Sequence, residues 1–164
     1  MLEEYLQWKP FFEIVPLENQ DCREISELHG QRFPRQWNDG EFLGLLLQPN
    51  VFGFIARQTN AFFSRPAAGF VLARETAGEA EILTIAVAER FAGAGLGWRL
   101  MQAALREAEQ RGAEEIFLEV EAANEPAVRL YRKLDFVTVA ERPAYYESAG
   151  GERSSALVMK RDLR

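Results

Sequence analysis

The chain has 164 residues, of which 48% are apolar and 27% charged, and its formal net charge is −6. This length and this mixture are typical of a single globular domain, 1–164, and exclude a disordered chain. The excess of acidic residues is unsuited to a protein that follows nucleic-acid phosphates. The single cysteine, Cys22, and the single histidine, His29, leave almost no material for a disulfide framework, a zinc site or a Ser-His-Asp triad. Both are interpreted as packing or surface residues.

The sequence also limits where the protein works. Its longest apolar stretch, around 43–47, is too short to span a bilayer. The N-terminus is acidic and lacks the basic and apolar regions of a signal peptide. One cysteine fits a reducing compartment. We therefore expect a cytoplasmic protein with no membrane, metal or direct nucleic-acid partner.

The first half of the chain reads as a strand, two helices and three more strands. A short strand is predicted over Phe11–Val15. The next two helices each start with a capping box, Asp21 with Glu24 and Asn38 with Glu41. Pro- and Gly-bearing connections then separate strands over 51–57, 69–74 and 79–87, which predicts an antiparallel meander.

The second half alternates between helices and strands. A strong helix is predicted over Gly95–Arg111, because apolar residues recur at spacings of three and four before Gly112. A strand over 116–121, a helix over 124–134 and closing strands near 136–140 and 156–160 follow. The strands at 79 and 116, with the long helix between them, form a right-handed parallel β-α-β unit. We expect an α+β (mixed α/β) fold with a central, mostly antiparallel sheet, one parallel β-α-β unit and helices on both faces.

The connection after Val87 is rich in glycine, with Gly93, Gly95 and Gly97 at a strand-to-helix turn. Glycines let several backbone N–H groups point into one concavity, and the helix N-terminus and Arg90 add positive charge. Such a turn is suited to a pyrophosphate, although a plain tight turn has the same composition. The spacing matches neither the dinucleotide fingerprint nor a P-loop.

Three polar residues follow on the next strand and helix. Glu119 shares a strand face with Phe117, and it is either a solvent-facing carboxylate or a general base partly shielded from water. Tyr131 falls on the apolar stripe of the next helix, which is typical of a core residue with its hydroxyl at the rim. Asn124 is suited to cap that helix.

The combination of these motifs is more specific than any one of them. The order Ile85-Ala86-Val87, Arg90-x-x-Gly93-x-Gly95, Leu118-Glu119-Val120, Asn124 and Leu130-Tyr131-x-x-x-x-Phe136 resembles the GNAT N-acetyltransferases. Within them it most resembles the bacterial ribosomal-protein-alanine N-acetyltransferases. The similarity is strongest over 69–159 and weaker over 33–42.

This resemblance implies acetyl-coenzyme A as donor, a primary amine as acceptor and direct transfer in a ternary complex. It implies Glu119 as proton acceptor and Tyr131 as proton donor. The residues that would bind the cofactor are Ile85, Ala86, Val87, Arg90, Gly93, Ala94, Gly95, Leu96, Gly97, Trp98 and Asn124. Those that would bind the acceptor are Trp37, Tyr145 and Tyr146.

The expected acceptor is the N-terminal α-amine of a protein, namely the alanine of a small-subunit ribosomal protein. An α-amine, with a pKa near 7.7–8.0, is partly neutral at physiological pH, whereas lysine, near 10.4, is almost wholly charged. The acidic chain also suits a basic protein tail. Two alternatives remain open: a small-molecule amine (an amino acid, polyamine or aminoglycoside), or a non-catalytic acyl-coenzyme-A-binding module.

The sequence departs from the family pattern at two places. Asp135 stands before Phe136 where the family commonly has glycine, and aspartate tolerates the left-handed conformation better than most residues. Ser154 and Ser155 precede the closing strand where the family usually has acidic residues. The second departure borders the acceptor side.

Overall fold

The computed structural model describes residues 9–147, 150–151 and 153–164, which form seven strands, four α-helices and two short 3₁₀ helices. The strands are β1 (Phe12–Pro16), β2 (Val51–Gln58), β3 (Ala67–Thr76), β4 (Glu79–Val87), β5 (Glu115–Glu121), β6 (Val137–Glu147) and β7 (Arg153–Asp162). The helices are η1 (Asn19–Asp21), α2 (Cys22–Arg32), α3 (Asp39–Leu46), η2 (Glu89–Phe91), α4 (Leu96–Gln110) and α5 (Glu125–Lys133).

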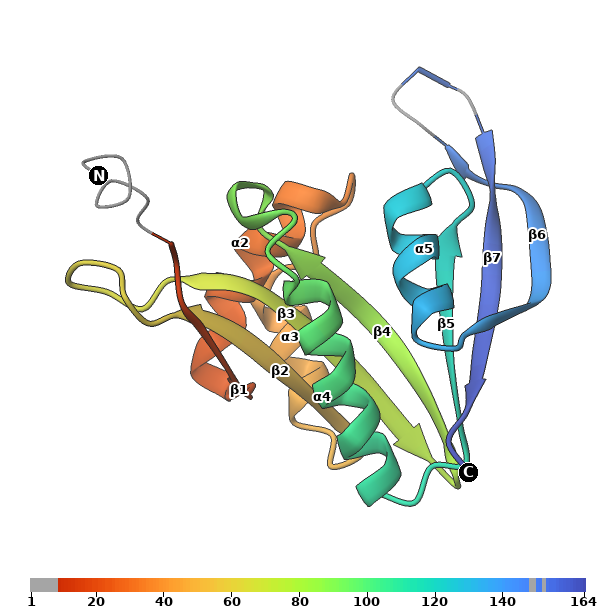
Figure 1. The fold of residues 1–164 in the computed structure, drawn as a ribbon, viewed down its shortest axis with the longest axis horizontal. Coiled ribbons are helices and arrows are strands. Elements are labelled where there is room, and N and C mark those ends of the chain that lie inside the picture. The colour runs from red at the N-terminus through yellow and green to blue at the C-terminus, as the bar shows by residue number, and fades with distance from the viewer. Residues whose placement is uncertain (1–8, 148–149, 152) are drawn as a thin grey trace, which may run out of the picture.

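All seven strands belong to one sheet in the order β1-β2-β3-β4-β5-β7-β6. Every neighbouring pair is antiparallel except β4 and β5, which are parallel and joined through α4. This confirms the expected meander, the β-α-β unit and the mixed sheet. Figure 1 shows the strongly twisted sheet with α4 in front of β2 and β3, and α2 and α3 behind them.

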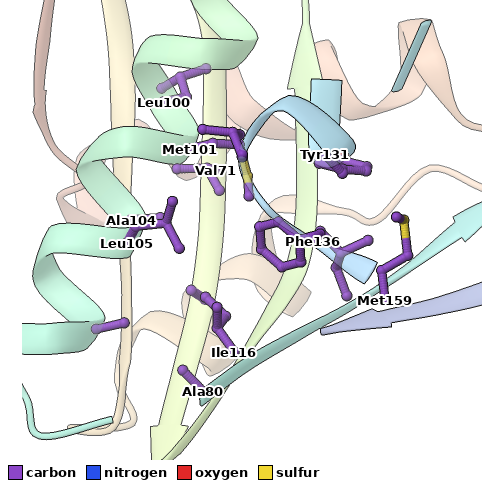
Figure 2. Packing of buried hydrophobic residues seen from close by; sticks show 14 of the residues in the cluster. Val71, Ala80, Leu100, Met101, Ala104, Leu105, Ile116, Tyr131, Phe136 and Met159 are labelled. Atoms are coloured by element: carbon purple, nitrogen blue, oxygen red, sulfur yellow. The ribbon is translucent and has the colours of Figure 1, made fainter. Parts of the chain in front are cut away.

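Two hydrophobic clusters lie on the two faces of this sheet. The α4 and α5 face contains Leu100 and Met101 of α4, packed with Val71, Ile116 and other strand residues (Figure 2). The opposite face is covered by α2 and α3, and its cluster contains Ile25, Leu28, Phe42, Ile55, Phe70 and Leu72. Helices therefore cover both faces, as expected.

Helix α4 shows why its sequence pattern is informative. The residues that recur at spacings of three and four are the buried ones, including Leu100, Ala104 and Ala108. A Cβ on Gly97 would lie 3.1 Å from the Leu130 side chain. The missing side chain at this position lets α5 approach α4 closely.

Of the two expected capping boxes, one is confirmed and the other is not. Asn38 caps α3 as expected, since its Oδ1 accepts a hydrogen bond from the Glu41 N–H at 2.8 Å. The expected box of Asp21 with Glu24 is wrong. The Asp21 carboxylate accepts from the Glu18 N–H at 2.8 Å and from Arg57 Nη2 at 2.6 Å instead. One carboxylate oxygen thus belongs to a capping box that begins one turn earlier, at Glu18, and the other is occupied by a charged donor from β2.

The last two strands are longer than the sequence indicated. They were expected near 136–140 and 156–160, and they extend to Val137–Glu147 and Arg153–Asp162. Pro143 lies within β6, which the sheet tolerates because β6 is an edge strand. Asp135 has a φ of 66°, so aspartate occupies the left-handed position after α5 that glycine would occupy more easily.

Candidate functional site

A cleft opens where β4 and β5 separate. The two strands pair only through Glu79 with Glu115, Ala80 with Ile116 and Glu81 with Phe117. Beyond these pairs they diverge toward their carboxyl ends, as Figure 1 shows. The resulting cavity has a volume of about 1090 Å³ and is lined by residues of β4, β5, α2 and α5 and of the α2–α3 connection.

An irregularity in β4 lies at the start of this separation. Thr84 pairs with Leu72 and Ile82 pairs with Ala73, so Leu83 is an extra residue in β4. A bulge of this kind bends its strand and increases the local twist. It also places Thr84 on the face of Leu72, which is the face covered by α2 and α3. The bulge therefore turns a polar side chain toward the cleft.

Alternation along β5 puts its carboxylates on that same face. Ile116, Leu118 and Val120 belong to the hydrophobic cluster under α4 and α5. The intervening residues, including Glu119, therefore point to the α2 and α3 side. The Glu119 side chain is 36% exposed and lines the cleft.

Glu119 is held by an arginine from β6. Arg142 Nη2 lies 3.1 Å from Glu119 Oε1. Arg142 is 54% exposed, so this ion pair lies at the open side of the cleft and solvent screens it. The pair orients the carboxylate without burying it.

Tyr131 reaches the cleft from the other face of the sheet. It lies on α5, is 6% exposed, and packs edge-on against Phe136 with ring centroids 6.0 Å apart (Figure 2). Burial raises the pKa of Tyr131 to about 12. The hydroxyl therefore stays protonated at neutral pH and can only act as a neutral donor or acceptor there.

The start of α5 also borders the cleft. Asn124 Oδ1 accepts a hydrogen bond from the Ala127 N–H at 3.3 Å, which confirms it as the cap of α5. Both Asn124 and Ala127 line the cavity. The cap fixes the first turn of α5, and with it the helix that carries Tyr131.

Aromatic residues from α2 and the α2–α3 connection form the opposite wall. His29 stacks between Phe33 and Trp37, with ring centroids 4.3 Å and 4.9 Å away. The Trp37 N–H donates a hydrogen bond to His29 Nδ1 at 3.2 Å. Burial lowers the pKa of His29, and the charge of Glu41 opposes that shift. His29 is therefore a packing residue, as predicted, and it lines the cleft as well.

Ser154, which stands where the family usually has an acidic residue, binds a carboxylate of the cleft. Ser154 Oγ donates a hydrogen bond to Glu121 Oε1 at 2.5 Å. Glu121 lines the cavity and lies on the same face as Glu119. On this side of the cleft the carboxylate is therefore supplied by Glu121 of β5, and Ser154 donates a hydrogen bond to it.

The backbone N–H groups at the N-terminus of α4 form another part of the candidate site. Gly93 and Gly95 have φ values of 81° and 77°, and the N-cap Gly95 offers no side chain to the helix. No hydrogen bond within the described residues satisfies the N–H groups of Gly93, Gly95, Leu96, Gly97 and Trp98. Such a set of free amides at a helix N-terminus is suited to an anion.

The structure brings five of the expected site residues to the cleft and leaves the others at its flanks or outside the described part. Glu119, Tyr131, Asn124, Ile85 and Trp37 all line the cleft. Ala86 and Val87 continue β4, which past Glu81 is paired with β3 on one side only. The Arg90 guanidinium lies 4.6 Å above the Phe91 ring, just before the glycine-rich turn that holds Ala94. Tyr145 and Tyr146 lie on β6, and their side chains fall outside the described part of the structure.

Sequence reasoning missed several cleft residues. Thr84 of β4 and His29 of α2 line the cleft, and Arg142 of β6 pairs with Glu119 there. No local motif gives any of these three a role in this cleft. Only the alternation of β5 gave a signal, because it placed Glu119 and Glu121 on one face. The rest required the sheet to bring α2 and β6 next to β5.

The described residues form neither a metal site nor a membrane-spanning helix. No group of three or more His, Cys, Asp or Glu side chains among them is arranged to hold a metal ion. None of the helices they form is long and apolar enough to cross a membrane.

Residues 9–136 match the model of the acetyltransferase (GNAT) family. N-alpha-acetyltransferase 30 of Schizosaccharomyces pombe is 28% identical over 133 residues, which are 81% of this chain and 89% of that protein. The [ribosomal protein bS18]-alanine N-acetyltransferase of Escherichia coli is 35% identical over 92 residues, 56% of this chain and 62% of that protein. The crystal structure of the ribosomal-protein-S18-alanine N-acetyltransferase from Escherichia coli superimposes with a TM-score of 0.83 at 26% identity, covering 93% of this chain and 94% of that one.

Proposed function

The chain belongs to the GNAT family of acetyltransferases, and from this membership we infer that it transfers the acetyl group of acetyl-coenzyme A to the N-terminal α-amine of a protein. The observation that carries the proposal is the placement of Glu119 and Tyr131. They enter one cleft from opposite faces of the sheet, through the opening between β4 and β5. An amine and a thioester can meet there between a base and a hydrogen-bond donor.

Glu119 acts as the proton acceptor in this proposal. An ammonium group must lose a proton before its nitrogen can attack a carbonyl carbon. About a quarter of an α-amine with a pKa near 7.7–8.0 is neutral at pH 7.4, against roughly one part in a thousand of a lysine. A carboxylate open to solvent on one side can take the remaining proton directly or through a water. Arg142 keeps the carboxylate oriented.

Tyr131 acts on the departing sulfur. A thiol has a pKa near 8.5, and burial raises the pKa of Tyr131 to about 12, so complete proton transfer from tyrosine to thiolate is uphill. The hydroxyl therefore serves best as a hydrogen-bond donor that stabilises charge on sulfur as the bond breaks. The nitrogen, more acidic once acylated, supplies the proton that the sulfur finally takes up.

The free amides at the start of α4 fit the pyrophosphate of coenzyme A. Five unpartnered N–H groups of the described chain lie at one helix N-terminus, and Arg90 precedes them in the chain. The edge of β4 over Ile85–Val87 has no β5 partner, so its backbone groups are available to an extended ligand such as pantetheine. Asn124 would contact the donor beside them. Binding here aligns the thioester with the cleft, which is the main remaining contribution to the rate.

The α2 side of the cleft is then the acceptor side. It carries Trp37, and by its likeness to the family it would also carry Tyr145 and Tyr146. The similarity to two N-terminal acetyltransferases supports a protein N-terminus as acceptor. We propose the alanine of a basic small-subunit ribosomal protein, a substrate that would place the enzyme in the cytoplasm and that the net charge of −6 suits.

A small-molecule amine is the second candidate acceptor. The mycothiol acetyltransferase of Corynebacterium aurimucosum is 36% identical over 76 residues, which are only 25% of that protein. The aligned part covers 46% of this chain. A relative that is named for a small molecule therefore shares part of this sequence. A coenzyme-A-binding module without turnover is a third possibility, and the presence of both Glu119 and Tyr131 in the cleft speaks against it.

The test is acetyl transfer followed by mass spectrometry with a panel of acceptors. The panel contains peptides with free N-terminal Ala, Ser, Met or Gly, the same peptides with blocked N-termini and an internal lysine, and several small amines. We expect acetylation of free N-termini, strongest for Ala. Acetylation of small amines alone would contradict the protein acceptor, and binding of coenzyme A without any transfer would favour the module.

A further inference from the structure

One side chain in the cleft has a specific polar atom that no part of the described fold uses. His29 is 2% exposed, and its Nδ1 accepts the hydrogen bond of the Trp37 N–H. A neutral imidazole that accepts at Nδ1 carries its proton on Nε2. The lowered pKa of His29 keeps the ring in this neutral form at physiological pH. His29 is therefore fixed as an Nε2–H donor.

The Nε2–H group has no hydrogen-bond partner among the described residues. Among the described residues, Thr84 Oγ1 is the one side-chain nitrogen or oxygen atom that has neither a hydrogen-bond partner nor any surface open to solvent. Nε2 of His29, equally unpartnered, must therefore retain accessible surface, and the cavity that His29 lines provides it. A ligand that fills the cavity would cover this donor, and leaving it unpaired would then cost free energy, so the site favours a ligand that offers it an acceptor.

The ring itself is held rigidly. Phe33 and Trp37 stack on its two faces, and Phe42 meets its edge at a centroid distance of 5.7 Å. Three rings and one hydrogen bond leave the imidazole a single orientation. A donor held this rigidly selects ligands by the position of their acceptor atom, because an acceptor atom at another position cannot form the hydrogen bond.

The charged groups around the acceptor side have partners of their own. Arg32 pairs with Glu89 at 3.4 Å, and Arg35 pairs with Glu41 at 3.2 Å. Glu119 pairs with Arg142. The uncharged side-chain donors of this wall that have no hydrogen-bond partner among the described residues are His29 Nε2–H and the indole N–H of Trp37. His29 is the more buried of the two, and it is held between two stacked rings. Thr84 Oγ1 lies on the same face.

We propose that His29 Nε2–H donates a hydrogen bond to the carbonyl oxygen next to the acceptor amine, so that the cleft selects α-amino amides over simple amines. This inference rests on the proposed acetyl transfer to an N-terminal amine. At a peptide N-terminus the amine and the first carbonyl carbon are bonded to the same α-carbon, so the two groups keep a short and nearly fixed separation. A polyamine has no such oxygen. His29 is therefore a specificity-determining residue.

The experiment compares two acceptors and three proteins. One acceptor is an alanyl peptide, and the other replaces its first amide by a trans alkene, which keeps the shape but lacks the carbonyl oxygen. The proteins are the wild type, His29→Phe and His29→Gln. Phenylalanine keeps the stack without the donor, and glutamine can supply an N–H near the original position. The initial rates give kcat and KM for each pair.

We expect the wild type to prefer the amide, in kcat/KM, by roughly 5- to 100-fold, the effect of leaving one buried donor unpaired. His29→Phe should lower this preference by that factor, mainly through a higher KM for the amide, with the alkene unaffected. His29→Gln should restore part of it. The two acceptors also differ in the basicity of their amines. The ratio of their kcat/KM values is therefore compared between proteins, so that this difference and any general loss of activity cancel.

Two results would overturn the proposal. In one, the wild type does not distinguish the two acceptors, which is decisive even if His29→Phe fails to fold. In the other, both variants keep the wild-type preference undiminished. A wild type that acetylates no peptide at all contradicts the proposed function instead, and the two failures are therefore separate.

Discussion

At the scale of single residues, the cleft separates two chemical tasks by the face of the sheet from which each side chain comes. Glu119 points from β5 to the α2 side, where solvent and Arg142 reach it. Tyr131 comes from α5 and is buried among apolar residues. One environment keeps a carboxylate available for protons, and the other keeps a phenol neutral.

Replacing Tyr131 with Phe should lower kcat by about 10²- to 10³-fold, the effect of losing one donor to developing charge, while the affinity for coenzyme A changes little. The ring that packs against Phe136 remains, so thermal unfolding should occur at nearly the same temperature. Because burial raises the pKa of Tyr131 to about 12, its ionisation should not depress the wild-type rate until the pH approaches that value. Steady-state kinetics over pH test both points. An unchanged kcat in the variant would refute the role given to this hydroxyl.

At the scale of elements, the turn into α4 determines how the donor binds. Gly93 and Gly95 adopt positive φ values that aim successive amides to one side, and the helix adds its partial positive charge. Gly112 also has a positive φ, 91°, but it lies at the other end of α4. Both ends of α4 therefore have a glycine with a positive φ. Only the N-terminal end belongs to the proposed pyrophosphate site.

A Gly93→Val variant should bind coenzyme A roughly 5- to 100-fold more weakly, since valine disfavours the left-handed backbone that presents the amides. Gly112→Val is the matched control, because a Cβ added to either glycine would have no neighbour within 4 Å. Its affinity should stay close to that of the wild type although its stability falls. Calorimetric titration gives both affinities. Equal losses in the two variants would place the pyrophosphate site elsewhere.

At the scale of the whole molecule, the position of α2 depends on a buried ion pair. Asp21, which precedes α2, is 5% exposed and accepts from Arg57 Nη2 on β2 at 2.6 Å. Glu24 of the same helix also pairs with Arg57, at 2.9 Å. These contacts fix the start of α2 on the sheet, and α2 carries His29 on the wall of the cleft.

Asp21→Ala should reduce the free energy of unfolding by about 1.5–3 kcal/mol, because a buried carboxylate loses its charge-assisted hydrogen bonds to Arg57 and to the Glu18 N–H, although Glu24 still pairs with Arg57. Glu13→Ala is the control, since its pair with Arg65 is exposed and should contribute less than about 1 kcal/mol. Urea unfolding followed by fluorescence measures both. Similar small losses in the two variants would show that the buried pair does not hold α2.

The amino-acid sequence by itself determined the elements and their order. Amphipathic spacing in α4, alternation in β5 and the Asn38 cap are local patterns, and the structure confirms each of them. The β-α-β unit follows from that order, because parallel neighbours joined by one helix cross over in a single hand. The spacing, the alternation and the cap depend on contacts between residues a few positions apart, and the order of the elements then limits how the sheet can pair.

Only the tertiary structure decided how the cleft is lined. The Asp21 carboxylate binds Arg57, which is 36 positions away, in preference to the local amide that its sequence context suggested. His29 meets the same cavity as Glu119, 90 positions further along the chain, and Arg142 joins from the edge of the sheet. The physical reason is that pairing, twist and the bulge at Leu83 set which distant side chains share a face and where two strands part.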